Sequence, residues 1–203
     1  MANDMTATTA SLGQIIESSL DRFTFALYSD ASTPMLGTPV IARPAGAREV
    51  CVYGVVVGID VGGIDGSRGI DLRRREDEGH EPALSANPHL SYILRRSCET
   101  LVIAHEADRR IFAFLPPTPP LPWDGVVAGD DHALRALAAD LDVLRPLVNA
   151  GPDRDDATAA FVRLLSSAHT DARTFRVHAG KALARLLASD PPRLTALLRK
   201  IRP

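Results

Sequence analysis

The chain has 203 residues, of which 45% are hydrophobic, so it is long enough to form one large domain or two small ones around a real core. Its formal net charge of −2 excludes a globally basic nucleic-acid binder but leaves room for a local basic patch. The charge is uneven, because residues 1–130 carry 11 Lys and Arg against 17 Asp and Glu, whereas residues 131–203 carry 12 against 8. Two regions with different surfaces are therefore expected.

Residues 1–11 are polar and have no apolar stretch, so they are predicted to be a disordered tail and no signal peptide. No run of about 18 apolar residues occurs, so no membrane span is expected, and the cytoplasm is the default location. Two cysteines, Cys51 and Cys98, are too few for a disulfide framework and are predicted to be core thiols.

Two strands are expected at residues 13–17 and 22–28. In the second, Phe23, Phe25 and Leu27 alternate with more polar residues, and this period of two is typical of a half-buried strand.

A short apolar piece at residues 39–42 leads to a longer one at residues 49–59. The longer run is apolar on both faces and rich in valine, which predicts a central strand. Gly54 and Gly58 interrupt it in a way that fits a β-bulge or a tight barrel bend.

The β pattern fails at residues 60–88, which are rich in glycine and charge, so a long mobile excursion that includes one helical turn is expected there. A short helix at residues 90–96 would complete this excursion, which then covers residues 60–96. Strands resume at residues 100–105 and 110–115 as a hairpin.

Residues 116–123 contain five prolines, which predicts an extended polyproline segment at the end of the β region. It is expected to be a rigid strap on the barrel; the alternative is a Pro-x-x-Pro ligand for an aromatic groove. The β domain is accordingly assigned to residues 12–125 and a helical region to residues 126–203.

Four helices are predicted from the helical period of leucines and from their capping residues. Asp130 or Asp131 should cap the first, which Pro146 should end or kink. Asp190 and Pro191 give the fourth a strong start signal. The predicted positions are about 131–148, 155–168, 170–187 with Thr170 as cap, and 191–201.

Catalytic motifs are not found. A phosphate-binding loop needs a Lys followed by Ser or Thr, but Ala182 follows Gly180 and Lys181, so ATP binding is not expected. The six histidines lack the spacing of a metal site, and Asp60, Asp65 and Asp71 do not fit a calcium loop. The chain is therefore predicted to be no enzyme and to bind no cofactor or metal.

Five arginines are candidates for binding a phosphate backbone. For the first three, a solvated charged loop is the alternative, since the acidic residues 76–78 follow directly and would neutralise much of their field. The candidates are Arg73, Arg74, Arg75, Arg95 and Arg96.

Several short motifs together resemble a known family. The motifs are Gly-Gln-Ile-Ile-Glu-Ser-Ser at 13–19, Phe-Thr-Phe at 23–25 and Tyr-Gly-Val-Val at 53–56. They are similar to the HAS-barrel, the small N-terminal β-barrel of HerA-type DNA-translocating ATPases and of the catalytic subunits of rotary ATP synthases. Residues 115–120, 141–145 and 194–201 are similar to a bacterial family of stand-alone HAS-barrel proteins that is common in cyanobacteria. The resemblance implies an α+β protein, with a small N-terminal β-barrel followed by a C-terminal region of about four helices.

In HerA-type ATPases this barrel caps a ring, helps subunits assemble and recruits partners such as the nuclease NurA. Because the motor domain and its Walker motifs are missing here, the resemblance implies a non-enzymatic assembly or interaction module. A HerA-like ATPase or its nuclease is the expected partner, in a DNA-processing or DNA-repair setting, and homo-oligomerisation is left open. The alternative is a direct nucleic-acid binder that uses the net-positive helical region. Exposed aromatic side chains beside arginines would favour nucleic acid, and an exposed apolar patch would favour a protein partner.

Overall fold

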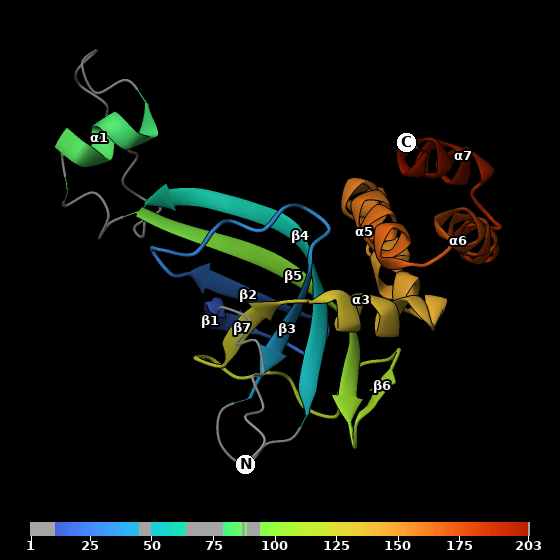
Figure 1. Ribbon diagram of the computed structural model, residues 1–203, viewed down its shortest axis with the longest axis horizontal. Coiled ribbons are helices and arrows are strands. Elements are labelled where there is room, and N and C mark those ends of the chain that lie inside the picture. Colours follow the sequence, from blue (N-terminus) through green and yellow to red (C-terminus); the bar gives the residue numbers. More distant parts are fainter. Residues whose placement is uncertain (1–10, 45–49, 64–78, 87, 89–93, 203) are drawn as a thin grey trace.

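A closed barrel of six antiparallel strands followed by helices forms the fold, as seen in a computed structural model of the protein (Figure 1). The structure describes residues 11–44, 50–63, 79–86, 88 and 94–202. The strands are β1 (Ser11–Ser18), β2 (Arg22–Leu27), β3 (Pro39–Arg43), β4 (Cys51–Gly63), β5 (Leu94–Ala107), β6 (Arg110–Phe112) and β7 (Gly125–Ala128). The predicted α+β class, with an N-terminal barrel and C-terminal helices, is confirmed.

The ring of the barrel runs β1–β2–β5–β4–β3–β7 and returns to β1, while β6 pairs with β5 outside the ring. Closure depends on β7, which pairs with both β1 and β3. The proline segment is predicted to end the β region, and the sequence shows no signal for this strand. β7 has only four residues, Gly-Val-Val-Ala, and is too short to show a period in the sequence. Because it pairs with β1 and β3, the barrel extends to Ala128.

The central strand β4 is apolar on both faces because both faces are buried. Val52 and Val56 point into the barrel, whereas Tyr53, Val55 and Val57 belong to the core on its outer side. The predicted irregularities occur, since the β4–β5 register shifts between Tyr53 and Gly54 and between Val56 and Gly58. A side chain could not be tolerated at residue 54 without movement, because a Cβ there would lie 2.3 Å from the Thr100 methyl group.

The excursion is partly regular structure. β4 continues to Gly63, which pairs with Leu94 at the start of β5, so this hairpin projects away from the barrel (Figure 1). The predicted helix at residues 90–96 is wrong over residues 94–96, because cross-strand hydrogen bonds hold this polar stretch extended although it has no strand period. Residues 64–78 and 89–93, including most of the segment predicted to be mobile, lie outside the described residues, and between them α1 (His80–Ala86) is helical.

The first predicted helix is wrong as a single element. α3 (Asp131–Ala138) ends early, and a 3₁₀ turn η2 (Leu141–Leu144) then leads into α4 (Arg145–Asn149). The break lies at Ala139 and Asp140, and the Asp140 side chain accepts a hydrogen bond from the Asp142 N–H and so starts a new turn. Pro146 lies at the beginning of α4, where its missing N–H costs nothing, and does not end a helix.

The other helices follow the prediction closely. They are α5 (Asp155–Ala168), preceded by a 3₁₀ turn η3 (Pro152–Arg154), α6 (Ala172–Leu186) and α7 (Pro191–Ile201). Asp130 caps α3 and Asp190 caps α7 as predicted, while Asp171 caps α6 in place of the expected Thr170. Asp171 can accept from two backbone N–H groups, those of residues 173 and 174.

The helical region packs on the outer face of the barrel. One continuous core joins barrel residues such as Val55 and Ile103 to helical residues such as Leu147 and Phe161. Arg154 fastens the junction, since it donates to the Val57 carbonyl at 3.0 Å and to both carboxylate oxygens of Glu99 at 2.8 and 2.9 Å. Barrel and helices therefore share one core, as expected for helices that dock on the barrel.

Because the core is shared, we expect barrel and helices to unfold in a single transition. Phe161→Ala removes a fully buried ring from that core and should cost about 3–5 kcal/mol of unfolding free energy. Calorimetry and far-ultraviolet circular dichroism of the full chain measure both effects, with the exposed Arg199→Ala as a control near zero. Two separate transitions, one of them insensitive to Phe161→Ala, would contradict a shared core.

Candidate interaction surface

Exposed apolar side chains gather at one end of the barrel. Eleven large hydrophobic residues are exposed among the described residues, and six of them lie in β1, in the β1–β2 turn and in the connection from β6 to β7. We call these six the barrel-end surface: Ile16, Leu20, Phe114, Leu115, Leu121 and Trp123. A concentration of this kind marks a binding surface more often than chance exposure does.

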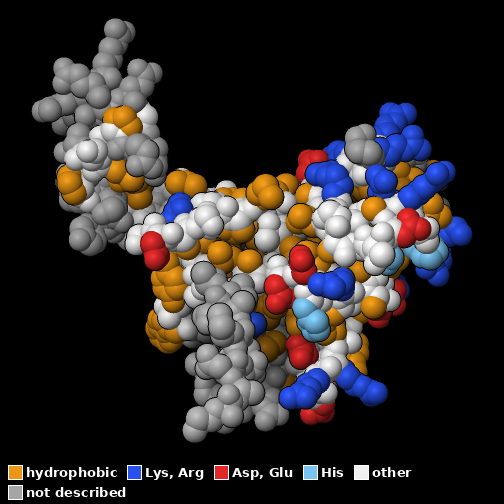
Figure 2. Space-filling model, in the orientation of Figure 1, with side chains coloured by type: hydrophobic (Ala, Val, Ile, Leu, Met, Phe, Trp, Pro, Cys, Tyr) orange, Lys and Arg blue, Asp and Glu red, His pale blue; other side chains and the backbone are white. Residues whose placement is uncertain are grey.

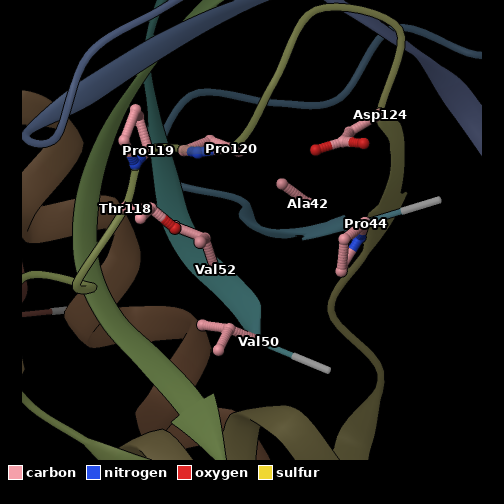
Figure 3. A pocket seen from close by; sticks show the side chains of 8 residues that line it. All are labelled: Ala42, Pro44, Val50, Val52, Thr118, Pro119, Pro120 and Asp124. Carbon is pink, nitrogen blue, oxygen red and sulfur yellow. The ribbon is translucent and has the colours of Figure 1, made fainter. Parts of the chain in front are cut away.

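The β6–β7 connection crosses the barrel end as a strap. Figure 3 shows Pro119 and Pro120 of this connection facing Ala42 of β3 and Val52 of β4 across a small cavity of about 140 Å³. Pro120 is buried, so the Pro-x-x-Pro segment is part of the barrel and is not free to enter the groove of another protein in its present conformation. This position agrees with the predicted strap.

Trp123 is the most exposed large hydrophobic residue of the described chain, with 78% of its surface accessible. Its backbone is held in the left-handed region, at a φ of 70°, which is unfavourable for a residue with a Cβ. Two backbone hydrogen bonds fix the local geometry, from the Trp123 N–H to the Ile15 carbonyl and from the Ile15 N–H to the Asp124 carbonyl. The Asp124 side chain is buried and accepts from the Leu121 N–H, so it holds the turn that presents the indole.

A β-bulge brings a second apolar side chain to the same place. The β1–β2 register shifts between Ile15 and Glu17, so Ile16 is an extra residue without a partner on β2. Its side chain is 40% exposed, next in sequence to the residue that is hydrogen-bonded to Trp123. Bulges commonly re-aim one side chain in this way near functional sites.

On the other flank, the Phe114 ring packs edge-on against His105 and at a tilt against Phe112, two strand residues that stack on each other. The ring centroid of Phe114 lies 5.0 Å from that of His105 and 5.4 Å from that of Phe112, and His105 Nδ1 lies 3.1 Å from the Phe114 carbonyl. Phe114 is nevertheless 61% exposed and, with Leu115, borders a groove of about 590 Å³ between the barrel and α4. The aromatic cluster thus gives the barrel-end surface a rigid edge.

The groove contains arginines, but each has a carboxylate partner. Arg22 pairs with Asp21 at 2.9 Å, and Arg145 pairs with Asp142 at 3.0 Å. Arg154 is held by Glu99 at 2.8 Å. Exposed aromatic residues therefore do occur near arginines here, but the positive charge is neutralised locally, which favours an apolar partner over a phosphate backbone.

Of the five predicted arginines, the structure describes Arg95 and Arg96. Arg73, Arg74 and Arg75 lie outside the described residues. Arg95 is exposed, whereas Arg96 donates to the Tyr28 and Ser29 carbonyls and to the Thr33 hydroxyl and so holds the β2–β3 loop. Arg96 thus has a structural role, and the binding role of the five candidates stays a prediction.

Among the described residues, no three His, Cys, Asp or Glu side chains are arranged to hold a metal ion. None of the described helices is long and apolar enough to cross a membrane. Burial raises the pKa of the Cys98 thiol to about 11, with Asp60 adding to the effect, so this core thiol stays protonated at neutral pH.

No protein-family model matches this chain, and no match is found among curated proteins.

If Trp123 is kept for binding, its replacement should not harm the fold. Trp123→Gly relieves a left-handed backbone strain of about 1–2 kcal/mol but adds about 0.5–1 kcal/mol of chain entropy to the unfolded state. Stability is therefore expected to stay level or to rise by up to about 1.5 kcal/mol, measured by chemical denaturation. Trp123→Ala keeps the strain and serves as the comparison. A loss of several kcal/mol in Trp123→Gly would mean that the indole is a packing residue.

Proposed function

We propose that the protein is a non-enzymatic assembly module that binds another protein through its barrel-end surface. The observation that carries this proposal is Trp123, a large aromatic side chain that is exposed at a cost in backbone strain. Tryptophan dominates the energetics of many protein interfaces because it buries a large rigid area with little loss of conformational entropy. Leu121 and Ile16 beside it supply further apolar area.

The proposed partner is a HerA-like ATPase or its nuclease. The closed barrel supports the resemblance to the HAS-barrel on which this choice rests. Its motifs lie in barrel strands, at residues 13–18 in β1, 23–25 in β2 and 53–56 in β4. In HerA-type ATPases the barrel contributes to assembly, so a stand-alone barrel with an apolar end surface would bind such a ring or a component of it.

The test compares variants as bait in the organism that makes the protein. Affinity purification with mass spectrometry should recover a HerA-like ATPase or its nuclease with the wild-type chain and lose it about tenfold or more with Trp123→Gly, as for an interface hot spot. Leu121→Ser should weaken recovery as well. Met35→Ala is the matched control, because Met35 is 70% exposed in the β2–β3 loop, away from the barrel-end surface.

Equal recovery by the Trp123→Gly and Met35→Ala variants would exclude the barrel-end surface. Recovery of no ATPase or nuclease would exclude the proposed partner. Light scattering measures the molar mass of the purified chain in solution. If the wild-type chain is an oligomer and the Trp123→Gly variant is a monomer, a second copy of the chain is the partner at this surface.

A further inference from the structure

The last two helices are strongly basic. Residues 172–202, which comprise α6, the turn after it and α7, contain eight Lys and Arg and a single acidic residue, Asp190. Figure 2 shows blue side chains gathered over this part of the molecule, at the upper right, where Figure 1 places α6 and α7. The net charge of +7 in this stretch accounts for more than the whole positive excess of the helical region.

Two of the eight cations are paired with carboxylates within the fold, and Arg176 donates to the Ala172 carbonyl of its own helix at 3.2 Å. Arg193 is largely buried against Asp155, at 2.7 Å, and also donates to the Val148 carbonyl. Lys200 pairs with Asp156 at 2.8 Å. The other six have no carboxylate partner among the described residues, and we call them the basic face: Arg173, Arg176, Lys181, Arg185, Arg199 and Arg202.

The helices hold these cations on the outside. Phe175, Ala179 and Leu183 bury one side of α6, and Leu197 and Ile201 bury one side of α7. Arg173 and Arg185 are exposed and twelve residues apart, which spans about 18 Å along α6. The two helices pack closely at Gly180, where a Cβ would lie 3.7 Å from Leu198, so the cations of α7 lie on a neighbouring element.

Unpaired cations at this density repel one another, and in this they differ from the arginines of the groove beside Phe114. There, Arg22, Arg145 and Arg154 each have an acidic partner, whereas the basic face has none within the described chain. A surface that keeps several like charges together without neutralising them is suited to an extended polyanion, whose binding releases counterions.

The chemistry of the face narrows the choice of polyanion. Phe175 is the only Phe, Tyr or Trp in the stretch and is buried, so the large aromatic rings on which single-stranded bases usually stack are missing from this surface, and only His178 and the arginines themselves could stack on a base. Val177 is the only exposed large hydrophobic residue in this stretch, which is too little apolar surface to insert into a lipid bilayer. Phosphates on a duplex, by contrast, need only cations at the surface.

We infer that the basic face of α6 and α7 binds the phosphate backbone of double-stranded DNA without reading its sequence. This inference is independent of the proposed function, because it concerns a different surface and rests on no partner protein.

Fluorescence anisotropy of the full chain with a labelled mixed-sequence duplex tests the inference. The dissociation constant should be in the micromolar range at about 50 mM salt. The logarithm of the association constant should fall linearly with the logarithm of the salt concentration, with a slope of about −5 if all six cations contact phosphates. Lys181→Glu with Arg185→Glu should weaken binding at least about tenfold and reduce the slope by about 2. Arg135→Glu with Arg145→Glu is the matched control, since it reverses two exposed helical arginines outside α6 and α7 and makes the same change in net charge.

Three outcomes would overturn the inference: no binding at low salt, an equal loss in both double variants, or tighter binding to a single strand of the same length than to the duplex. Stronger binding to vesicles with anionic lipid than to the duplex would assign the face to membranes and would also overturn it. Circular dichroism confirms folding of each variant, and if the charge reversal unfolds the chain, Lys181→Gln with Arg185→Gln gives the same slope test. The Trp123→Gly variant should bind the duplex like the wild type, which separates this inference from the proposed function.

Discussion

The wall made by β4 and β5 is buried on both faces, and most of the structure depends on it. Inward side chains such as Val56 and Val102 fill the barrel, and outward ones such as Val55 and Ile103 join the core under the helices. At about 25 cal/mol for each Å² of apolar surface removed from water, neither face could be left open without a large loss of stability. The helical region is thus a covering layer for one side of the barrel, which explains why helices as short as α4 are ordered.

The same constraint leaves the barrel end available. The helices cover the outer wall and the strap from β6 to β7 covers the interior, so the side chains on the strap's own outer side have nothing left to pack against. Pro116 and Pro120 are buried while Leu121 and Trp123 are exposed, as expected if one side of the strap faces the barrel and the other side faces solvent. Asp124, buried and hydrogen-bonded to the Leu121 N–H, makes the turn between these two faces.

Much of the fold could be predicted because each feature has a local cause. The period of two in β2, the doubly apolar run of β4 with its two glycines, and the caps at Asp130 and Asp190 all act through near neighbours. The features that were missed depend on distant ones. β7 is a strand only because β1 and β3 offer edges on either side of it, and residues 94–96 are extended only because β4 continues to pair with them.

The candidate site was harder to anticipate than the fold for the same reason. The candidate arginines are neighbours in sequence, but successive residues of a strand point to opposite sides, so β5 separates Arg95 from Arg96. The sequence does carry one signal for Trp123, because a tryptophan in a proline-rich segment without any period has no strand or helix face on which to be buried. The basic face was visible only as a regional charge excess, and it became a defined set of residues once Asp155 and Asp156 were seen to engage Arg193 and Lys200.

The two surfaces differ in how their energetic cost is met, and this difference bears on how the molecule could work. At the barrel end the cost is a strained backbone and an exposed indole, both of which a partner with a complementary apolar pocket would offset by burying the ring. On α6 and α7 the cost is mutual repulsion among six cations, which salt screens over about 8–10 Å and which a polyanion would offset without a shaped pocket. Apolar contact is selective and weakly sensitive to salt, whereas phosphate contact is unselective and strongly sensitive. Under the two proposals, a chain with one surface of each kind would choose its protein partner by shape and hold a nucleic acid by charge alone, and since the two surfaces lie on different elements, neither interaction would require the other to form first.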